Sequence, residues 1–178
     1  MTRNDLEKLI ELHGNDIYQF CFHLTGCRDD ADDLYQETLY KAFELRKKIK
    51  DPNDNSSFKE TRNYCFGIAS RLYKNINRKR LRHAEESLDN EQFDYNTQFA
   101  SDSNTEELVE KDEINKYLRN CIYSLPLKQR KVIYLFYFAD MSVKEISSVL
   151  RIPEGTVKSR LNTAKNALKI RLEEKGYA

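Results

Sequence analysis

Apolar side chains recur every three to four residues over most of this chain, a spacing that places them on one face of an α-helix. The first run extends from Leu6 to Leu24 and stops at Gly26, a residue type that commonly follows a helix end. A second run starts beside Asp29, and a third starts at Phe58. Because the chain has only five glycines and three prolines and little strand-like alternation, we predict an all-α fold.

Each of these three runs predicts a helix with one buried face. The expected buried positions are Leu6, Leu9, Ile10, Ile17, Phe20, Cys21 and Leu24 in the first run, Ala31, Leu34, Thr38 and Ala42 in the second, and Phe58, Thr61, Cys65, Ile68, Leu72 and Ile76 in the third. Residues 51–57 read DPNDNSS, and these residue types favour a turn throughout. The N-terminal half is therefore predicted to be a three-helix module.

Helical periodicity resumes at Glu106 and is interrupted at Pro126. Residues 132–138 are very apolar and lead into residues 141–168, which have the pattern of two short helices joined by a tight turn. Ser142 and Glu145 have the spacing of a capping box, which satisfies free backbone amides at a helix start.

The tight turn falls at residues 151–153, because the residue before Pro153 disfavours helical geometry. The second short helix starts near Glu154, where a negative charge suits the helix dipole. Its expected buried stripe is Val157, Leu161, Ala164 and Leu168. Its other face carries Thr156, Lys158, Ser159, Arg160, Asn162, Lys165 and Asn166. An ordinary amphipathic hairpin shares some of these features, but cap, turn and polar face together favour a DNA-binding helix-turn-helix.

Charge is strongly segregated along the chain, although the net charge is only +1. Residues 71–83 contain six basic residues and no acid, residues 84–113 contain eleven acids and one base, and residues 151–171 contain six bases and one acid. We therefore predict two small helical domains, 1–83 and 113–178, joined by a flexible acidic linker at 84–112. Two separate basic regions indicate polyanion contacts at two places.

The sequence favours no enzyme, cofactor or metal site. The three histidines are scattered, no glycine-rich phosphate loop or nucleophile motif occurs, and Cys21, Cys27, Cys65 and Cys121 show no zinc-ligand spacing. We expect these cysteines to be buried, reduced thiols. No apolar run approaches the length of a membrane span, and the N-terminus lacks a signal-peptide core. A cytoplasmic protein without membrane insertion is expected.

The third predicted helix combines cations with aromatic residues. Arg71, Lys74, Asn75, Arg78 and Lys79 interleave with Tyr64, Phe66 and Tyr73. Cations that neutralise phosphates beside aromatic rings that stack on bases are what single-stranded DNA requires. The residues alone are equally compatible with a basic helix end that has aromatic side chains in the core.

The second predicted helix carries acids and an amide near one face: Asp30, Asp33, Gln36 and Glu37. Such a face can dock on a basic surface of a partner protein. From these residues alone, the favoured interpretation is a solvated first turn whose acids complement the helix dipole.

Three blocks in order resemble the extracytoplasmic-function sigma factors of the sigma-70 family. They are DDADDLYQETLYKAFE at 29–44, NYCFGIASRLYKNINRKR at 63–80, and LPLKQRKVIYLFYFADMSVKEISSVLRIPEGTVKSRL at 125–161. The likeness spans most of residues 6–172. It implies a sigma factor that is not itself an enzyme, with domain 2 at 1–83 and domain 4 at 113–178.

The resemblance also implies a role for each candidate residue. By this resemblance, the β′ clamp helices of core RNA polymerase are contacted by Asp30, Asp33, Gln36 and Glu37. The β subunit of the polymerase is a further expected partner. The resemblance assigns the polar and basic residues of 71–79 to recognition and opening of the promoter −10 element. The 51–57 loop is expected to help form a pocket for a flipped base. The polar face of 156–165 becomes the −35 reader, and an anti-sigma factor is expected to hold the chain inactive, often at the membrane. A stand-alone regulator similar to LuxR-type activators in its C-terminal domain remains the alternative.

Four positions depart from the family pattern. Tyr64 stands where relatives often have Trp, and Arg71 stands where they often have Asn. Phe136 and Thr163 each replace a frequent Arg. Base preferences therefore cannot be transferred from relatives to this chain.

Overall fold

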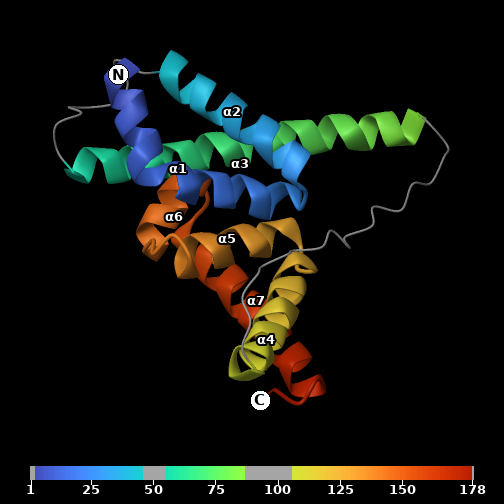
Figure 1. The fold of residues 1–178 in the computed structure, drawn as a ribbon. Helices are drawn as coiled ribbons and strands as arrows, with labels where there is room; N and C mark the ends of the chain where they lie inside the picture. The colour runs from blue at the N-terminus through green and yellow to red at the C-terminus, as the bar shows by residue number, and fades with distance from the viewer. Residues whose placement is uncertain (1–2, 46–54, 87–105, 178) are drawn as a thin grey trace. The chain divides into compact units, whose positions relative to one another are not determined.

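The computed structural model describes residues 3–45, 55–86 and 106–177, with side chains described for 4–45, 58–78 and 113–177. Within these ranges the chain forms α-helices and no strand, so the predicted all-α fold is confirmed (Figure 1). The helices are α1 (Arg3–Thr25), α2 (Arg28–Glu44), α3 (Asn55–Glu86), α4 (Glu106–Tyr123), α5 (Leu127–Tyr137), α6 (Val143–Leu150) and α7 (Glu154–Glu174).

The chain divides into two compact units. The first is Met1–Phe93 with Ser147–Arg151, and the second is Asp94–Ile146 with Ile152–Ala178. The predicted linker, 84–112, begins inside the last turn of α3 and ends inside α4. Its central part, 87–105, lies outside the described residues, so its flexibility and the exact domain limits stay predictions.

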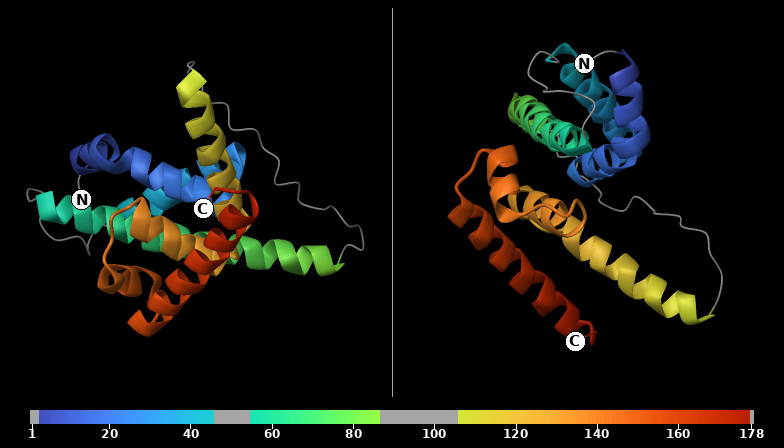
Figure 2. Two further views of the ribbon diagram at one scale, coloured as in Figure 1. Left: turned by 90° about the horizontal axis from the view of Figure 1, so that it is seen from below. Right: turned by 90° about the vertical axis from the view of Figure 1, so that its left-hand side faces the viewer.

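In the first unit, α1, α2 and α3 all pack against one another (Figures 1 and 2). Most of the apolar positions predicted from periodicity form the core, although Leu6, Leu72 and Ile76 are only half-buried. Ala31, Leu34, Thr38 and Ala42 are the buried residues of α2, as predicted. The rings of Phe20 and Phe66 meet edge to face, with centroids 5.0 Å apart, at the contact of α1 with α3. An aromatic pair of this kind adds to the free energy gained from apolar burial.

Gly26 ends α1 as the sequence predicts. Its φ of +82° is left-handed, and its amide donates to the Phe22 carbonyl at 2.8 Å. Thr25 adds a hydroxyl bond to the Cys21 carbonyl at 3.1 Å. A glycine adopts this conformation without the steric penalty of a Cβ atom, which lets α2 start only three residues after α1 ends.

Two expectations for the first unit are wrong in part. Residues 55–57, predicted to belong to a turn, already lie in α3, while 51–54 lie outside the described residues. Asn and Ser favour helix starts as well as turns, since both can cap free amides. Ile10 is 40% exposed although the periodicity placed it in the core, because its helix is covered by neighbours on only part of its surface.

Three of the four cysteines are buried, as expected, and all four are free thiols. Cys27 differs because it is only half-buried at the start of α2. Burial raises the pKa of Cys21 and of Cys65 to about 12, so both remain protonated at neutral pH.

In the second unit, α7 packs against α5 and α4. The guanidinium of Arg171 in α7 donates to the Cys121 carbonyl at 2.9 Å and also to the Ser124 hydroxyl, at the end of α4. The Tyr117 hydroxyl donates back to the Arg171 carbonyl at 3.1 Å. Buried Arg130 of α5 donates to the Tyr123 carbonyl at 3.3 Å. Two arginines thus satisfy the carbonyls that a helix end leaves without partners.

The predicted capping box is confirmed at the start of α6. The amide and hydroxyl of Ser142 donate to Glu145 Oε2 at 2.8 and 2.7 Å, and the Glu145 amide donates to Ser142 Oγ at 3.2 Å. The helix ends at Leu150, and Arg151 has a left-handed φ of +53° before Pro153 begins the approach to α7. The predicted order of helix, tight turn and helix is therefore present.

Candidate nucleic-acid and protein interfaces

The exposed side of α2 carries acids and an amide. Asp33, Gln36 and Glu37 are exposed, on the side of the helix away from its buried face. Their spacing of three and four residues places them on one surface. We call these three residues the α2 acidic face.

Asp30 has a different position from the other three predicted contacts. It is half-buried in the first turn of α2, beside Cys27. Burial raises the pKa of the Cys27 thiol, and a hydrogen bond to the Asp30 carboxylate raises it further. Asp30 is therefore engaged locally at the helix start, where an acid also complements the dipole.

Tyr40 extends the α2 acidic face and was not predicted from the sequence. It is 59% exposed and lies one turn beyond Gln36 and Glu37. Beside it, the Lys41 ammonium pairs with Glu44 at 2.7 Å and lies 5.6 Å from the Tyr40 ring centroid. An exposed tyrosine supplies the aromatic contact area that protein interfaces favour. In the sequence, the spacing of four residues between Gln36 and Tyr40 was the signal that could have placed Tyr40 on this face.

The basic side of α3 is also exposed. Arg71, Lys74, Asn75 and Arg78 are all exposed and follow one another at helical spacing; we call them the α3 basic stripe. Lys79 lies in the helix, but its side chain is outside the described residues. The stripe thus brings together four of the five cations and amides predicted to contact DNA.

The aromatic residues of α3 do not all accompany this stripe. Phe66 is fully buried and Tyr73 is 9% exposed, so both belong to the core of the first unit. Only Tyr64 is partly accessible. Of the two interpretations that the sequence left open, core aromatic side chains hold for Phe66 and Tyr73, and Phe66 meets the Phe20 ring of α1.

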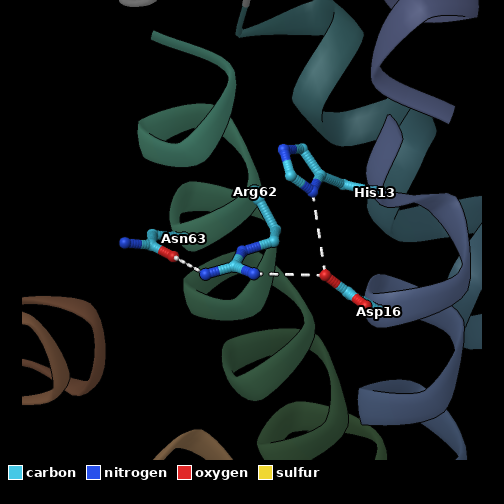
Figure 3. A network of polar contacts seen from close by, with 4 residues as sticks. All are labelled: His13, Asp16, Arg62 and Asn63. Atoms are coloured by element: carbon cyan, nitrogen blue, oxygen red, sulfur yellow. Dashed lines mark hydrogen bonds and ion pairs between the residues drawn. The ribbon is translucent and has the colours of Figure 1, made fainter. Parts of the chain in front are cut away.

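Arg62 joins α3 to α1 through a polar network (Figure 3). Its guanidinium donates to Asp16 Oδ2 at 3.1 Å, and His13 Nδ1 lies 3.7 Å from the same oxygen. Its other Nη group donates to Asn63 at 3.5 Å, and the cation lies 5.5 Å from the centroid of the Phe66 ring. Burial lowers the pKa of His13, and the Arg62 charge lowers it further. This network, which joins α1 to α3, could not be read from sequence spacing.

The outward face of α7 is polar, as predicted, and its parts differ in exposure. Lys158, Ser159, Asn162 and Asn166 are exposed, whereas Thr156 and Arg160 are half-buried. The Ser159 hydroxyl donates to the Thr156 carbonyl at 3.1 Å. Hydroxyls and amides therefore occupy the centre of the face, with cations toward its edges.

Lys165 lies beside an aromatic group that the sequence did not connect with it. Its ammonium is 5.5 Å from the Tyr137 ring centroid, at the end of α5. Tyr137 also meets the Phe136 ring edge to face at 5.1 Å. A ring face attracts a cation held over it, so Tyr137 helps to position Lys165 at the edge of the α7 face.

Within the described residues, no cluster of three or more His, Cys, Asp or Glu side chains has the arrangement of a metal site. None of the described helices has an apolar stretch long enough to cross a lipid bilayer.

Comparison with known proteins assigns both units. Residues 9–82 match the family described as Sigma-70 region 2, and residues 115–168 match Sigma-70, region 4. The first range contains α2 and the α3 basic stripe, and the second contains α5, α6 and most of the exposed face of α7.

Individual relatives match this chain in sequence over nearly its whole length. The chain is 29% identical to the ECF RNA polymerase sigma factor SigW of Bacillus subtilis (strain 168), over 93% of this chain and 88% of that protein. It is 29% identical to the ECF RNA polymerase sigma factor SigL of Mycobacterium tuberculosis (strain ATCC 25618 / H37Rv), over 96% and 90%.

Solved structures share the fold. The sigma factor RpoE from Bartonella quintana, crystallised with the anti-sigma factor NepR, has a TM-score of 0.75 at 21% identity, over 95% of this chain and 97% of that chain. CnrH in complex with the cytosolic domain of CnrY has a TM-score of 0.63 at 18% identity, over 97% and 90%. Regions 2 and 4 occur in one chain, and the two ECF RNA polymerase sigma factors match it over 93% and 96% of its length. The chain therefore belongs to the sigma-70 family, as an RNA polymerase sigma factor of the extracytoplasmic-function group.

Proposed function

We propose that this sigma factor directs promoter-specific transcription initiation through three surfaces: the α2 acidic face, the α3 basic stripe and the polar face of α7. It performs no catalysis of its own, because the polymerase carries out the chemistry. The observation that carries the proposal is that all three surfaces are exposed while each helix buries its opposite face.

The α2 acidic face docks on the β′ clamp helices of core RNA polymerase. Asp33, Gln36 and Glu37 supply charge and hydrogen bonding, and Tyr40 supplies apolar contact area. Opposite charges on the two partners speed their encounter and fix its orientation. Asp30 supports the start of α2 and contributes less directly. The second unit contacts the β subunit.

The α3 basic stripe binds the −10 element and assists its opening. Its cations, with Lys79 beyond them, neutralise the phosphates of the displaced strand, while Tyr64 offers one ring for stacking. Binding single-stranded DNA more tightly than duplex shifts the promoter toward the melted state, since a ligand favours the form that it binds better.

The polar face of α7 reads the −35 element in the major groove. Ser159 and Asn162 lie where base edges are contacted, and Lys158, Arg160, Thr156 and Lys165 contact phosphates or neighbouring bases. Each unit alone binds DNA weakly. Joining them through polymerase raises the effective concentration of the second contact, which produces the specificity.

An anti-sigma factor is the proposed inhibitor. Two proteins that share this fold have been solved as complexes: the sigma factor RpoE with the anti-sigma factor NepR, and CnrH with the cytosolic domain of CnrY. A protein that covers the α2 acidic face or the α3 basic stripe blocks polymerase or promoter binding. The chain is then held in the cytoplasm, at the inner side of the membrane when its inhibitor is anchored there.

The decisive experiment reconstitutes the full chain with core polymerase and measures transcripts from a library of promoter fragments. Promoter-dependent transcripts, together with a stable complex with core polymerase, are expected. The double variant D33K/E37K should lose both, whereas K128A, which alters an exposed charge in α5, should keep both. If D33K/E37K activates transcription as well as the wild type, the chain acts as a stand-alone DNA-binding regulator and the proposal fails.

A further inference from the structure

We propose that the −35 binding surface extends from α7 onto the end of α5. There the Tyr137 ring positions the Lys165 ammonium for one phosphate, and the Tyr137 hydroxyl donates to a neighbouring phosphate. The inference rests on the proposed function, because it requires the polar face of α7 to bind the −35 element. It goes further by adding a residue outside α7 and by giving its ring and its hydroxyl separate roles.

The contact between these two side chains is direct. The ammonium of Lys165 lies 5.5 Å from the centroid of the Tyr137 ring, within the distance at which a ring face attracts a cation. Tyr137 is the last residue of α5, and α5 packs against α7. The ring leaves the positive charge of Lys165 in place, because it has no charge of its own that would neutralise the ammonium.

Lys169, one turn beyond Lys165 on α7, has a different partner. Its ammonium faces the Glu173 carboxylate at 3.5 Å, so its charge is offset by an acid of the same helix. Both lysines are exposed, but only the Lys165 contact combines a positive charge with an uncharged partner. Lys165 is therefore the better placed of the two to attract an anion.

The Tyr137 ring is itself held in place. The Phe136 ring meets it edge to face, with the two centroids 5.1 Å apart, yet Tyr137 remains 52% exposed. A ring that is fixed on one side and open on the other can orient a neighbouring cation and still contact a ligand. Tyrosine hydroxyls are among the groups that bind DNA phosphates. A lysine that is oriented in advance also loses less conformational freedom when it binds.

The position of Lys165 along α7 favours a phosphate over a base edge. In a helix-turn-helix, the N-terminal residues of the second helix contact bases in the major groove. At 1.5 Å per residue, Lys165 lies about 16 Å along the helix from Glu154, where α7 begins. The major groove is only about 12 Å wide, so a residue this far along meets the backbone that borders it. An ammonium binds a phosphate as a point charge.

A purely structural contact is the competing explanation, since an exposed cation–π pair also contributes to folding stability. The neighbouring Phe138 offers a matched comparison. It is 56% exposed, and its ring stacks on Tyr134 with the centroids 5.5 Å apart. Phe138 is thus an exposed aromatic residue beside Tyr137 whose stacking partner belongs to α5 and not to α7.

The test measures binding of the complete holoenzyme to promoter fragments recovered in the transcription experiment, with the −35 element intact or scrambled. Y137F keeps the ring and removes the hydroxyl, whereas Y137A removes both. Each substitution is made alone and together with K165A. F138A is the matched control for an exposed ring, and K169A is the matched control for an exposed lysine.

The two substitutions at Tyr137 separate the roles of ring and hydroxyl. Y137F should weaken −35-dependent affinity by roughly 2- to 10-fold, as expected for one lost hydrogen bond. Y137A should weaken it by about 2- to 5-fold more, which corresponds to an exposed cation–π pair. In the K165A background, Y137F and Y137A should have equal effects, because the ring then has no cation to position. F138A and K169A should leave the affinity unchanged.

Several outcomes overturn the inference. Equal affinities of Y137F and Y137A in the wild-type background exclude the role of the ring, and wild-type affinity of Y137F excludes that of the hydroxyl. A difference between Y137F and Y137A that persists with K165A shows that the ring acts without Lys165. A loss in F138A as large as that in Y137A assigns the effect to any exposed ring.

The same measurement separates a failure at Tyr137 from a failure of the proposed function. If the wild-type holoenzyme binds the intact and the scrambled −35 fragments equally well, the proposed role of α7 is wrong. If it prefers the intact fragment and the variants at Tyr137 keep that preference in full, only the inference about α5 is wrong.

Discussion

The two helices that we propose contact DNA, α3 and α7, both expose polar and basic side chains but arrange them differently. On α7, Ser159 and Asn162 occupy the centre of the exposed face and Lys158 and Lys165 lie toward one edge. On α3, the cations follow one another along the helix, beside a glycine and one partly accessible tyrosine. Short donors at the centre of a face suit the major groove of a duplex. A row of cations beside a ring suits an unpaired strand.

The helices also differ in how they are held. The C-terminal part of α7 is fastened to α4 by Arg171, which bonds the Cys121 carbonyl and the Ser124 hydroxyl. The N-terminal half of α3 is fastened to α1 by the Arg62–Asp16 pair, and its basic stripe continues beyond that anchor. In each helix most of the residues proposed to contact DNA thus lie away from the polar anchor, so that they can bind without breaking it.

The largest expected effect concerns two aromatic residues of α3, Phe66 in the core and Tyr64 at the surface. F66A should destabilise the first unit by about 3–5 kcal/mol, because it removes a fully buried ring and leaves a cavity. Y64A should change the free energy of unfolding little and reduce promoter opening. Chemical denaturation and a melting assay with holoenzyme measure the two quantities. Equal stability of F66A and Y64A contradicts the assignment of Phe66 to the core.

A smaller effect is expected at the start of α6, in the second unit. S142A removes the hydroxyl that caps the helix and should cost about 1 kcal/mol of unfolding free energy. S148A, at an exposed position in the same helix, is the matched control and should cost less. Thermal or chemical unfolding of both variants checks this, and equal losses contradict the capping role.

The salt dependence of DNA affinity should also distinguish α3 from α7, with a smaller effect. K158A should reduce the slope of log affinity against log salt by about 0.9 on duplex −35 DNA, the value for one phosphate contact to B-DNA. R78A should reduce it by about 0.7 on DNA with a single-stranded −10 segment. K169A, whose ammonium faces Glu173 at 3.5 Å, is the control and should leave both slopes unchanged. If K158A changes the slope by the smaller amount and R78A by the larger one, the two helices bind the opposite forms of DNA from those proposed.

The smallest expected effect is the pH dependence at His13. Its folded pKa lies below the ordinary 6.5, because burial and Arg62 disfavour the charged ring. The unfolded chain therefore binds the proton first, and the associated stability, complete above pH 6.5, declines as the pH falls through the folded pKa. The unfolding free energy of the wild type should fall more than that of H13Q between pH 7 and 5.5. A steeper fall in H13Q contradicts the sign.

Local interactions explain why much of the fold could be predicted from the sequence. The capping box joins Ser142 to Glu145 across three residues, and the left-handed Gly26 ends α1 within one turn. The buried face of α2 follows from periodicity alone. Each of these depends on a few neighbouring residues, whose preferences do not require knowledge of distant partners.

The sites were predictable as surfaces and less so as individual contacts. Helical spacing correctly placed the exposed residues of the α3 basic stripe and the centre of the α7 face. It could not tell that Phe66 and Tyr73 turn into the core, since exposure depends on where α1 and α2 lie. It also gave no sign that Arg71 bonds its own helix or that Tyr137 positions Lys165.

The sequence by itself determined the helices, their caps, the segregation of charge and the family to which the chain belongs. Only the tertiary structure decided which side chains meet across helices. Arg62 finds Asp16 across 46 positions and Arg171 finds Cys121 across 50. The physical reason is that hydrogen-bond capping and periodic burial act within a turn or two of helix. A contact between distant positions exists only after packing has brought two helices together.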